Sequence, residues 1–145
     1  SNRSQASPRN RFHERRACRG VRLCAIGNLE LMRRLAASGA WLCAVAVALS
    51  AYAAHAIEGT QQARLQTAAL FAFGHGLALI VLAPRASSRA LLIGISSLLL
   101  GVLLFSGSLV AEALLGIRPR LAPFGGTLLI AGWLLLGAAM LKKEK

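Results

Sequence analysis

The sequence contains no aspartate. Its five acidic residues are all glutamate and are outnumbered by seventeen lysines and arginines. Paired carboxylates, a nucleophile–base set and a metal cluster are therefore missing from the chain. Cysteine is also scarce, because Cys18, Cys24 and Cys43 are an odd number and form no C-x-x-C motif, which argues against a disulfide framework. Since the spacing of His13, Cys18 and Cys24 fits no zinc pattern, no metal or cofactor is predicted.

Phosphate-binding loops are absent as well. The Gly74-His75-Gly76 and Gly125-Gly126 elements lack the polar helix and the lysine that complete such a loop. Together with the missing carboxylate pair, this predicts that the protein is not an enzyme.

Long apolar runs are what the sequence has in abundance, and 56% of its residues are hydrophobic. A helix needs about 20 apolar residues to cross the hydrocarbon core, where its own hydrogen bonds must satisfy the backbone. The sequence therefore predicts an all-α, integral membrane four-helix bundle in residues 32–145. The expected spans are about 35–57, 66–83, 90–117 and 124–141.

Residues 1–31 differ from the rest, because nine of the seventeen basic residues precede Leu35. They predict a basic, partly disordered N-terminal arm whose partners are anionic lipid headgroups rather than nucleic acid. Met32-Arg33-Arg34 before an apolar run is how many bacterial membrane proteins begin, so the arm is either native or an upstream extension. The segment from Met32 to Ala56 also imitates a secretory signal, and a retained first helix is the favoured reading.

The basic residues near the span ends favour one orientation. Seven of them fall on the N-terminal side of the predicted membrane and three on the other side, which predicts that both termini are cytoplasmic. The first group is Arg33, Arg34, Arg85, Arg89, Lys142, Lys143 and Lys145, and the second is Arg64, Arg118 and Arg120. The expected location is a bacterial inner membrane, with anionic headgroups at its cytoplasmic face.

Small residues at intervals of three or four predict which faces of the helices meet, because they let helices in lipid approach closely. The first expected stripe is Ala40, Ala44, Ala48, Ala51 and His55; the second is Ala68, Ala72 and His75; the third is Gly94, Ser97, Gly101, Phe105, Ser108 and Glu112.

Three elements of the last two spans are distinctive: Phe105-Ser106-Gly107-Ser108-Leu109, Pro123-Phe124-Gly125-Gly126 and Gly132-Trp133. They resemble the signature of a small four-span membrane family, domain of unknown function 423, which includes the animal transmembrane protein 256. Upstream, Ala51-Tyr52-Ala53-Ala54-His55 is similar to the family's stretch ending in Ala-His-Gly, and residues 67–79 are similar to its Tyr-Gln-x-x-His-Ala-Leu segment.

The resemblance covers about residues 35–141 and implies four spans in a bacterial inner membrane. It implies no reaction. The chain departs from the family pattern at Ala56, at Val110 and at Glu112, where the family is usually apolar.

Polar groups inside a bilayer are costly and are candidates for function. The candidates here are His55, His75, Ser106, Ser108 and Glu112, with His55 and Glu112 expected to pair near the outer end. A helix-packing motif is expected at Gly107, Gly125, Gly126 and Trp133, with Gly107 packed tightly against a neighbouring helix.

Three functions remain open. The favoured one is a structural or accessory membrane component that packs with itself or a larger complex. The second is a small transporter or proton conductor that uses His55, His75 and Glu112. The third is an anionic-lipid binder.

Overall fold

The computed structural model describes residues 8–117 and 120–142, with side chains from residue 27 onward. The chain forms two compact units, residues 1–31 and residues 32–145. In the first unit, α1 (Pro8–Ala56) begins at Pro8, so the described part of the predicted arm is helical. Proline suits a first helical turn, because the amide that it lacks would have no partner there. Residues 1–7 of the arm lie outside the described residues.

The second unit contains the end of α1 and the other helices. These are α2 (Gly59–Leu82), the 3₁₀ turn η1 (Ala83–Arg85), α3 (Arg89–Leu115) and α4 (Ala122–Leu141). Four segments are long and apolar enough to cross a membrane: Gly27–Ala56, Gly59–Arg85, Arg89–Leu115 and Ala122–Leu141. The four predicted spans are confirmed, although α2 begins seven residues before the predicted span. Its first two turns are polar, and run length alone does not detect them.

Local chemistry explains where the helices begin and end. Gly59 has a φ of +69°, and Gly116 ends α3 with a φ of +68°, a left-handed conformation that glycine adopts without steric cost. Ser88 begins α3 by accepting a hydrogen bond from the Leu91 amide at 3.2 Å. Pro84 lies in η1, directly after α2. Because proline has no backbone N–H to donate, it does not continue the hydrogen-bond pattern of the α-helix.

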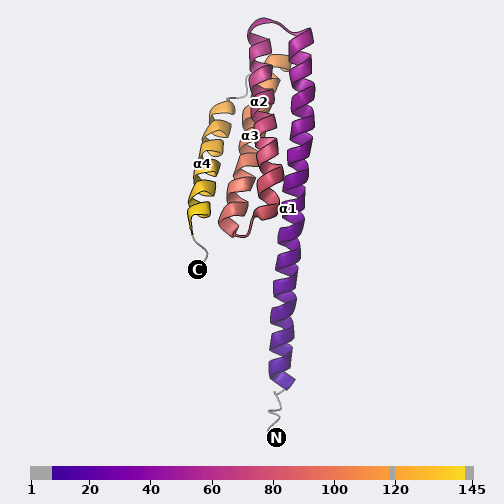
Figure 1. Ribbon diagram of the computed structural model, residues 1–145, viewed down its shortest axis with the longest axis vertical. Coiled ribbons are helices and arrows are strands. Elements are labelled where there is room, and N and C mark those ends of the chain that lie inside the picture. The colour runs from indigo at the N-terminus through magenta and orange to yellow at the C-terminus, as the bar shows by residue number, and fades with distance from the viewer. Residues whose placement is uncertain (1–7, 118–119, 143–145) are drawn as a thin grey trace. The chain divides into compact units, whose positions relative to one another are not determined.

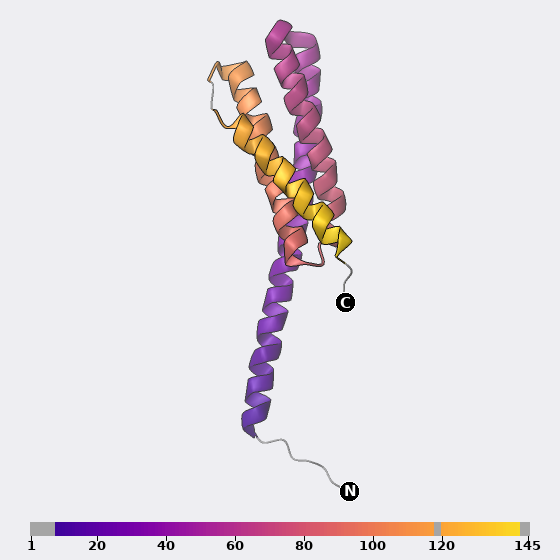
Figure 2. The ribbon, with the colours of Figure 1, turned by 90° about the vertical axis from the view of Figure 1, so that its left-hand side faces the viewer.

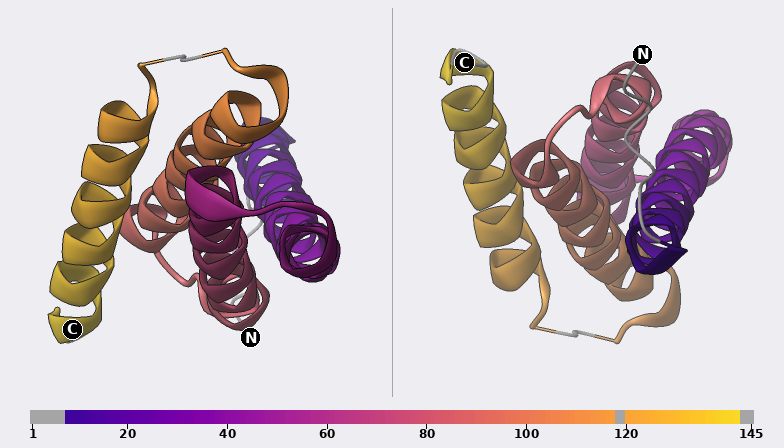
Figure 3. Two further views of the ribbon diagram at one scale, coloured as in Figure 1. Left: turned by 90° about the horizontal axis from the view of Figure 1, so that it is seen from above. Right: turned by 90° about the horizontal axis from the view of Figure 1, so that it is seen from below.

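The helices of the second unit run alternately up and down. The α1–α2 connection and the end of α3 lie at one end, and the α2–α3 connection and the end of α4 lie at the other (Figure 1). In Figure 2, α4 crosses α3 at an incline. Seen end on, α3 lies between α2 and α4, and α4 is on the side away from α1 (Figure 3). The α3 helix therefore has α2 on one side and α4 on the other.

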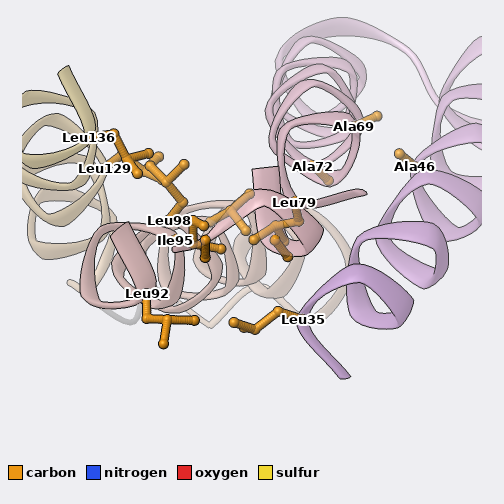
Figure 4. Close-up of a cluster of buried hydrophobic side chains, with 13 residues drawn as sticks. Leu35, Ala46, Ala69, Ala72, Leu79, Leu92, Ile95, Leu98, Leu129 and Leu136 are labelled. Atoms are coloured by element: carbon orange, nitrogen blue, oxygen red, sulfur yellow. The ribbon is translucent and has the colours of Figure 1, made fainter. Parts of the chain in front are cut away.

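The apolar core follows this arrangement. Leu79 of α2 and Leu98 of α3 are fully buried, and Leu136 of α4 is 1% exposed (Figure 4). A second cluster near the α1–α2 connection joins Ala53, Leu65 and Ala113. Large apolar side chains elsewhere, such as Leu70 and Leu134, are 70% exposed, as expected of surfaces solvated by lipid.

Glycines allow two pairs of helices to approach closely. A Cβ added at Gly39 of α1 would lie 2.5 Å from the carbonyl oxygen of Gly76 on α2, and one at Gly76 would lie 2.7 Å from that of Gly39. Between α3 and α4, a Cβ at Gly125 would lie 2.8 Å from the carbonyl oxygen of Gly101. Both contacts are backbone against backbone, the geometry that small residues permit in membranes.

The stripe predicted for the first helix is wrong. Ala40, Ala44, Ala48, Ala51 and His55 are all exposed, whereas Leu35, Gly39, Ala46 and Ala53 are buried. Alanine occurs on every side of α1, so residue spacing alone does not distinguish the two rows. The buried row is the one that contains Gly39, which allows the closest approach to α2.

Candidate functional site

An aromatic and imidazole cluster joins α2, α3 and α4 near the middle of their length. Phe71 stacks on His75 with ring centroids 5.8 Å apart, and Phe105 of α3 lies 4.6 Å from Phe71. Trp133 of α4 donates its indole N–H to Nε2 of His75 at 3.2 Å. The cluster places one polar contact, between α2 and α4, inside a predominantly apolar layer.

These contacts determine the state of the His75 ring. Nδ1 lies 2.8 Å from the carbonyl oxygen of Phe71, which can only accept, so Nδ1 carries the proton. Nε2 accepts from Trp133 and is therefore unprotonated. A neutral imidazole satisfies both bonds, whereas a second proton on Nε2 would face the indole donor.

Ser106 and Ser108 of α3 are 7% and 6% exposed. The Ser106 hydroxyl donates to the carbonyl oxygen of Ala68 on α2 at 3.0 Å. The Ser108 hydroxyl donates to the carbonyl oxygen of Phe105 on its own helix at 2.9 Å. Although both serines are buried, only Ser106 links two helices through the hydrogen bonds of its side chain.

The expected tight packing at Gly107 is absent. This residue is exposed, and a Cβ there would meet no atom within 4 Å. Residues 106 and 108 are both buried, and residue 107 lies between them around the helix axis. Position 107 therefore points away from the fold. The close contact of α3 with α4 lies instead at Gly125, while a Cβ at Gly126 would meet only the Phe105 ring, at 3.9 Å.

The expected pairing of His55 with Glu112 is not the one that the structure shows. The carboxylate of Glu112 forms an ion pair with Arg64 of α2, with Nη1 and Oε1 3.1 Å apart, and the His55 side chain is exposed. The polar start of α2 brings Arg64 to the end of α3. The sequence contains a signal for this pair, because the pattern of basic residues predicts Arg64 on the same side of the membrane as Glu112.

Sequence reasoning also missed two contacts between α1 and α2. Gly39 and Gly76 were not recognised as a pair, and the Cys43 thiol lies 3.7 Å from the carbonyl oxygen of Phe73, to which it donates. Gly39, Cys43 and Ala46 are small residues at intervals of three or four, a pattern that the sequence does display.

Two shallow hollows open at the surface. One, of about 370 Å³, lies between α1 and α2 beside Ser50, Gln66 and Phe73. The other, of about 350 Å³, lies between the start of α3 and the end of α4. Within the described side chains, no three His, Cys, Asp or Glu residues gather to hold a metal ion. The side chains of His13, Cys18 and Cys24 lie outside the described residues.

Comparisons with known proteins identify the family. Residues 49–126 match the family described as protein of unknown function (DUF423). That region contains His55, His75, Ser106 and Glu112, and Trp133 lies beyond it. None of the solved structures matches the chain.

Curated relatives are similar over most of their own length. A UPF0382 membrane protein of Staphylococcus haemolyticus is 35% identical over 106 residues, which cover 68% of this chain and 87% of the relative. A UPF0382 membrane protein of Haemophilus influenzae is 33% identical over 106 residues, covering 68% of this chain and 86% of the relative. Neither name states an enzymatic activity. Because the family model matches, the relatives are similar over most of their length and the helices are apolar, the chain belongs to the DUF423 family of small membrane proteins.

Proposed function

We propose that this protein is a structural or accessory component of the bacterial inner membrane, and that it packs with a second copy of itself or with a larger membrane complex. The observation that carries the proposal is the exposed alanine row of α1, which contains Ala40, Ala44, Ala48 and Ala51. At about 100° per residue, this row lies on the side of α1 opposite the buried Ala46 and Ala53. The helix thus has one packed face and a second face of small residues.

Burial supports a partner for that second face. In the most apolar window of each span, 17% of residues are buried in α1, which is the lowest share, against 22% in α4 and 33% in α2 and in α3. Small residues are enriched where membrane helices meet, because they let backbones approach and form van der Waals contacts. The alanine row fits another helix better than it fits lipid chains, which gain little from a smooth surface.

The polar groups of the fold favour a structural function over transport. His75 binds Trp133, Ser106 binds the backbone of α2, and Glu112 binds Arg64. Each of these contacts joins two helices, and together they fix the rotation of α2, α3 and α4 about their axes. His75 and Glu112 also bind different partners, so their contacts do not form one continuous path for proton transfer. We further propose that the protein is not an enzyme, because these polar side chains are used in contacts between helices.

The orientation that we propose places both termini in the cytoplasm. The α2–α3 connection, with Arg85 and Arg89, lies at the same end of the second unit as the end of α4, with Lys142 (Figure 1). Arg64 and Arg120 belong to the opposite end. An excess of arginine and lysine on one side is the main determinant of orientation for short loops.

Cross-linking in native membranes tests the proposed packing. In a variant whose three cysteines are replaced by alanine, Ala44→Cys should form a disulfide-linked dimer or a cross-link to one protein of defined mass after mild oxidation. Leu134→Cys on the outer face of α4, where the parent residue is 70% exposed, is the matched control and should form neither. Equal cross-linking at both positions, or none at Ala44 and at the neighbouring Ala40 and Ala48, would contradict the proposal.

A further inference from the structure

The hollow between the start of α3 and the end of α4 combines polar and apolar walls. Its volume of about 350 Å³ falls within the range of small-molecule sites, about 300–1,000 Å³. Ser87, Ser88 and Lys142 supply two hydroxyls and an ammonium group at its edge. The remaining wall is apolar and consists of Ala90, Leu91, Ala139 and Met140.

The polar groups suit an anion. The Lys142 ammonium carries three donors, and the Ser87 hydroxyl supplies another. The Ser88 hydroxyl accepts from the Leu91 amide, so its own hydrogen is left to donate outward. A group with several acceptor oxygens and a negative charge, such as a phosphate, matches this set of donors.

The charge around the hollow points the same way. Arg85 and Arg89 are close in sequence to the residues that line it, and Arg33 belongs to the same positive group near the span ends. In residues 32–142 the two glutamates are Glu58 and Glu112, both at the other end of the unit. Within this segment, an anion at this end therefore meets attraction from the arginines and from Lys142.

The apolar wall distinguishes a lipid from a free anion. Leu91 is half-buried and Met140 is 59% exposed, and both continue into the lipid-facing surfaces of α3 and α4. We propose that this hollow binds an anionic glycerophospholipid, with its phosphate beside Lys142 and Ser87 and an acyl chain along Leu91 and Met140. The proposal is independent of the α1 contact, because the two features lie on different helices.

Native mass spectrometry of the full chain tests the site. The protein is titrated in mild detergent with phosphatidylglycerol, with phosphatidylcholine, and with inorganic phosphate alone. We expect phosphatidylglycerol to bind more tightly than phosphatidylcholine, and inorganic phosphate at millimolar concentration neither to bind nor to displace it. Equal binding of both lipids would overturn the proposal, and tight binding of free phosphate would show that the hollow is a phosphate site.

Variants separate the hollow from general charge attraction. Lys142→Gln should weaken phosphatidylglycerol binding about fivefold, the typical contribution of one basic residue at an anionic surface. Ala139→Leu keeps the charge but fills the hollow, and should weaken binding as well. Arg33→Gln, at the same end but outside the hollow, is the matched control and should change binding much less. The same loss in Lys142→Gln and Arg33→Gln, or no loss with Ala139→Leu, would contradict a site in this hollow.

Discussion

Trp133 of α4 donates its indole N–H to the Nε2 atom of His75 on α2, at 3.2 Å. The bond spans two helices that are not neighbours in sequence and whose surfaces are otherwise mostly apolar. It also requires the neutral ring, because the Phe71 carbonyl already accepts the proton of Nδ1. The pair therefore sets the position of α4 relative to α2 by a directional contact.

Removing the indole donor should loosen α4. We expect Trp133→Phe to lower the free energy of unfolding by about 0.5–1.5 kcal/mol, since the aromatic volume is largely kept and one hydrogen bond is lost. Thermal unfolding in a mild detergent measures the change. Trp41→Phe is the matched control, because Trp41 is 74% exposed on α1 and should have little effect. Equal losses from both variants would show that the hydrogen bond contributes nothing specific.

Adding one methyl group at two glycines should have opposite effects. Gly125→Ala should destabilise the protein by about 1–3 kcal/mol, because the new Cβ would meet the backbone of Phe105 and Gly101. Gly107→Ala should be neutral or stabilising by up to about 1 kcal/mol, because alanine favours the helix and the position is open. The same unfolding assay distinguishes them. A destabilised Gly107→Ala variant would place residue 107 against a neighbour.

The ion pair of Arg64 and Glu112 should be weak. The side chains are 37% and 21% exposed, and pairs of this kind typically contribute about 0.2–1 kcal/mol and weaken in salt. A double-mutant cycle with Arg64→Gln and Glu112→Gln should give a coupling in this range at low salt. The parallel cycle with His55→Gln and Glu112→Gln should give almost none. A larger coupling to His55 than to Arg64 would restore the pairing expected from the sequence.

Labelling of single cysteines tests the proposed orientation. In the background without native cysteines, Ser87→Cys should be protected from an impermeant thiol reagent in intact cells, and Arg120→Cys should react. Permeabilised cells provide the control, in which both positions should react. The reverse pattern in intact cells would invert the topology.

The spans could be predicted from the sequence because hydrocarbon requires length and apolarity, which are visible in one dimension. Helix rotation could not be predicted equally well. On α2, Ala68 and Ala72 are both buried, as the stripe predicts. On α1, alanine occurs both in the packed row, at Ala46 and Ala53, and in the exposed row with Ala44. A lipid-facing side chain does not have to be polar. The alternation of apolar and polar residues that marks the buried face of a helix in a water-soluble protein is therefore missing here.

The partners of the polar groups were harder to predict for a related reason. His75 was recognised as a candidate polar group, but its partner Trp133 lies 58 residues further along the chain. That contact depends on the incline of α4 across α3, which no residue spacing encodes. Glu112 was expected to meet His55 because both lie near one end, and the structure shows an ion pair with Arg64, on the polar first turns of α2.

The placement of α4 on the free side of α3 has a consequence for biosynthesis. When the ribosome has released residues 32–115, α1, α2 and α3 can already bury Leu79 against Leu98, and Ala53 against Leu65 and Ala113. The α4 helix then has to pack against only one surface, the exposed side of α3, and to form the contact with the His75 ring. A chain interrupted in the connection between α3 and α4 should therefore still assemble when both pieces are made in the same cell.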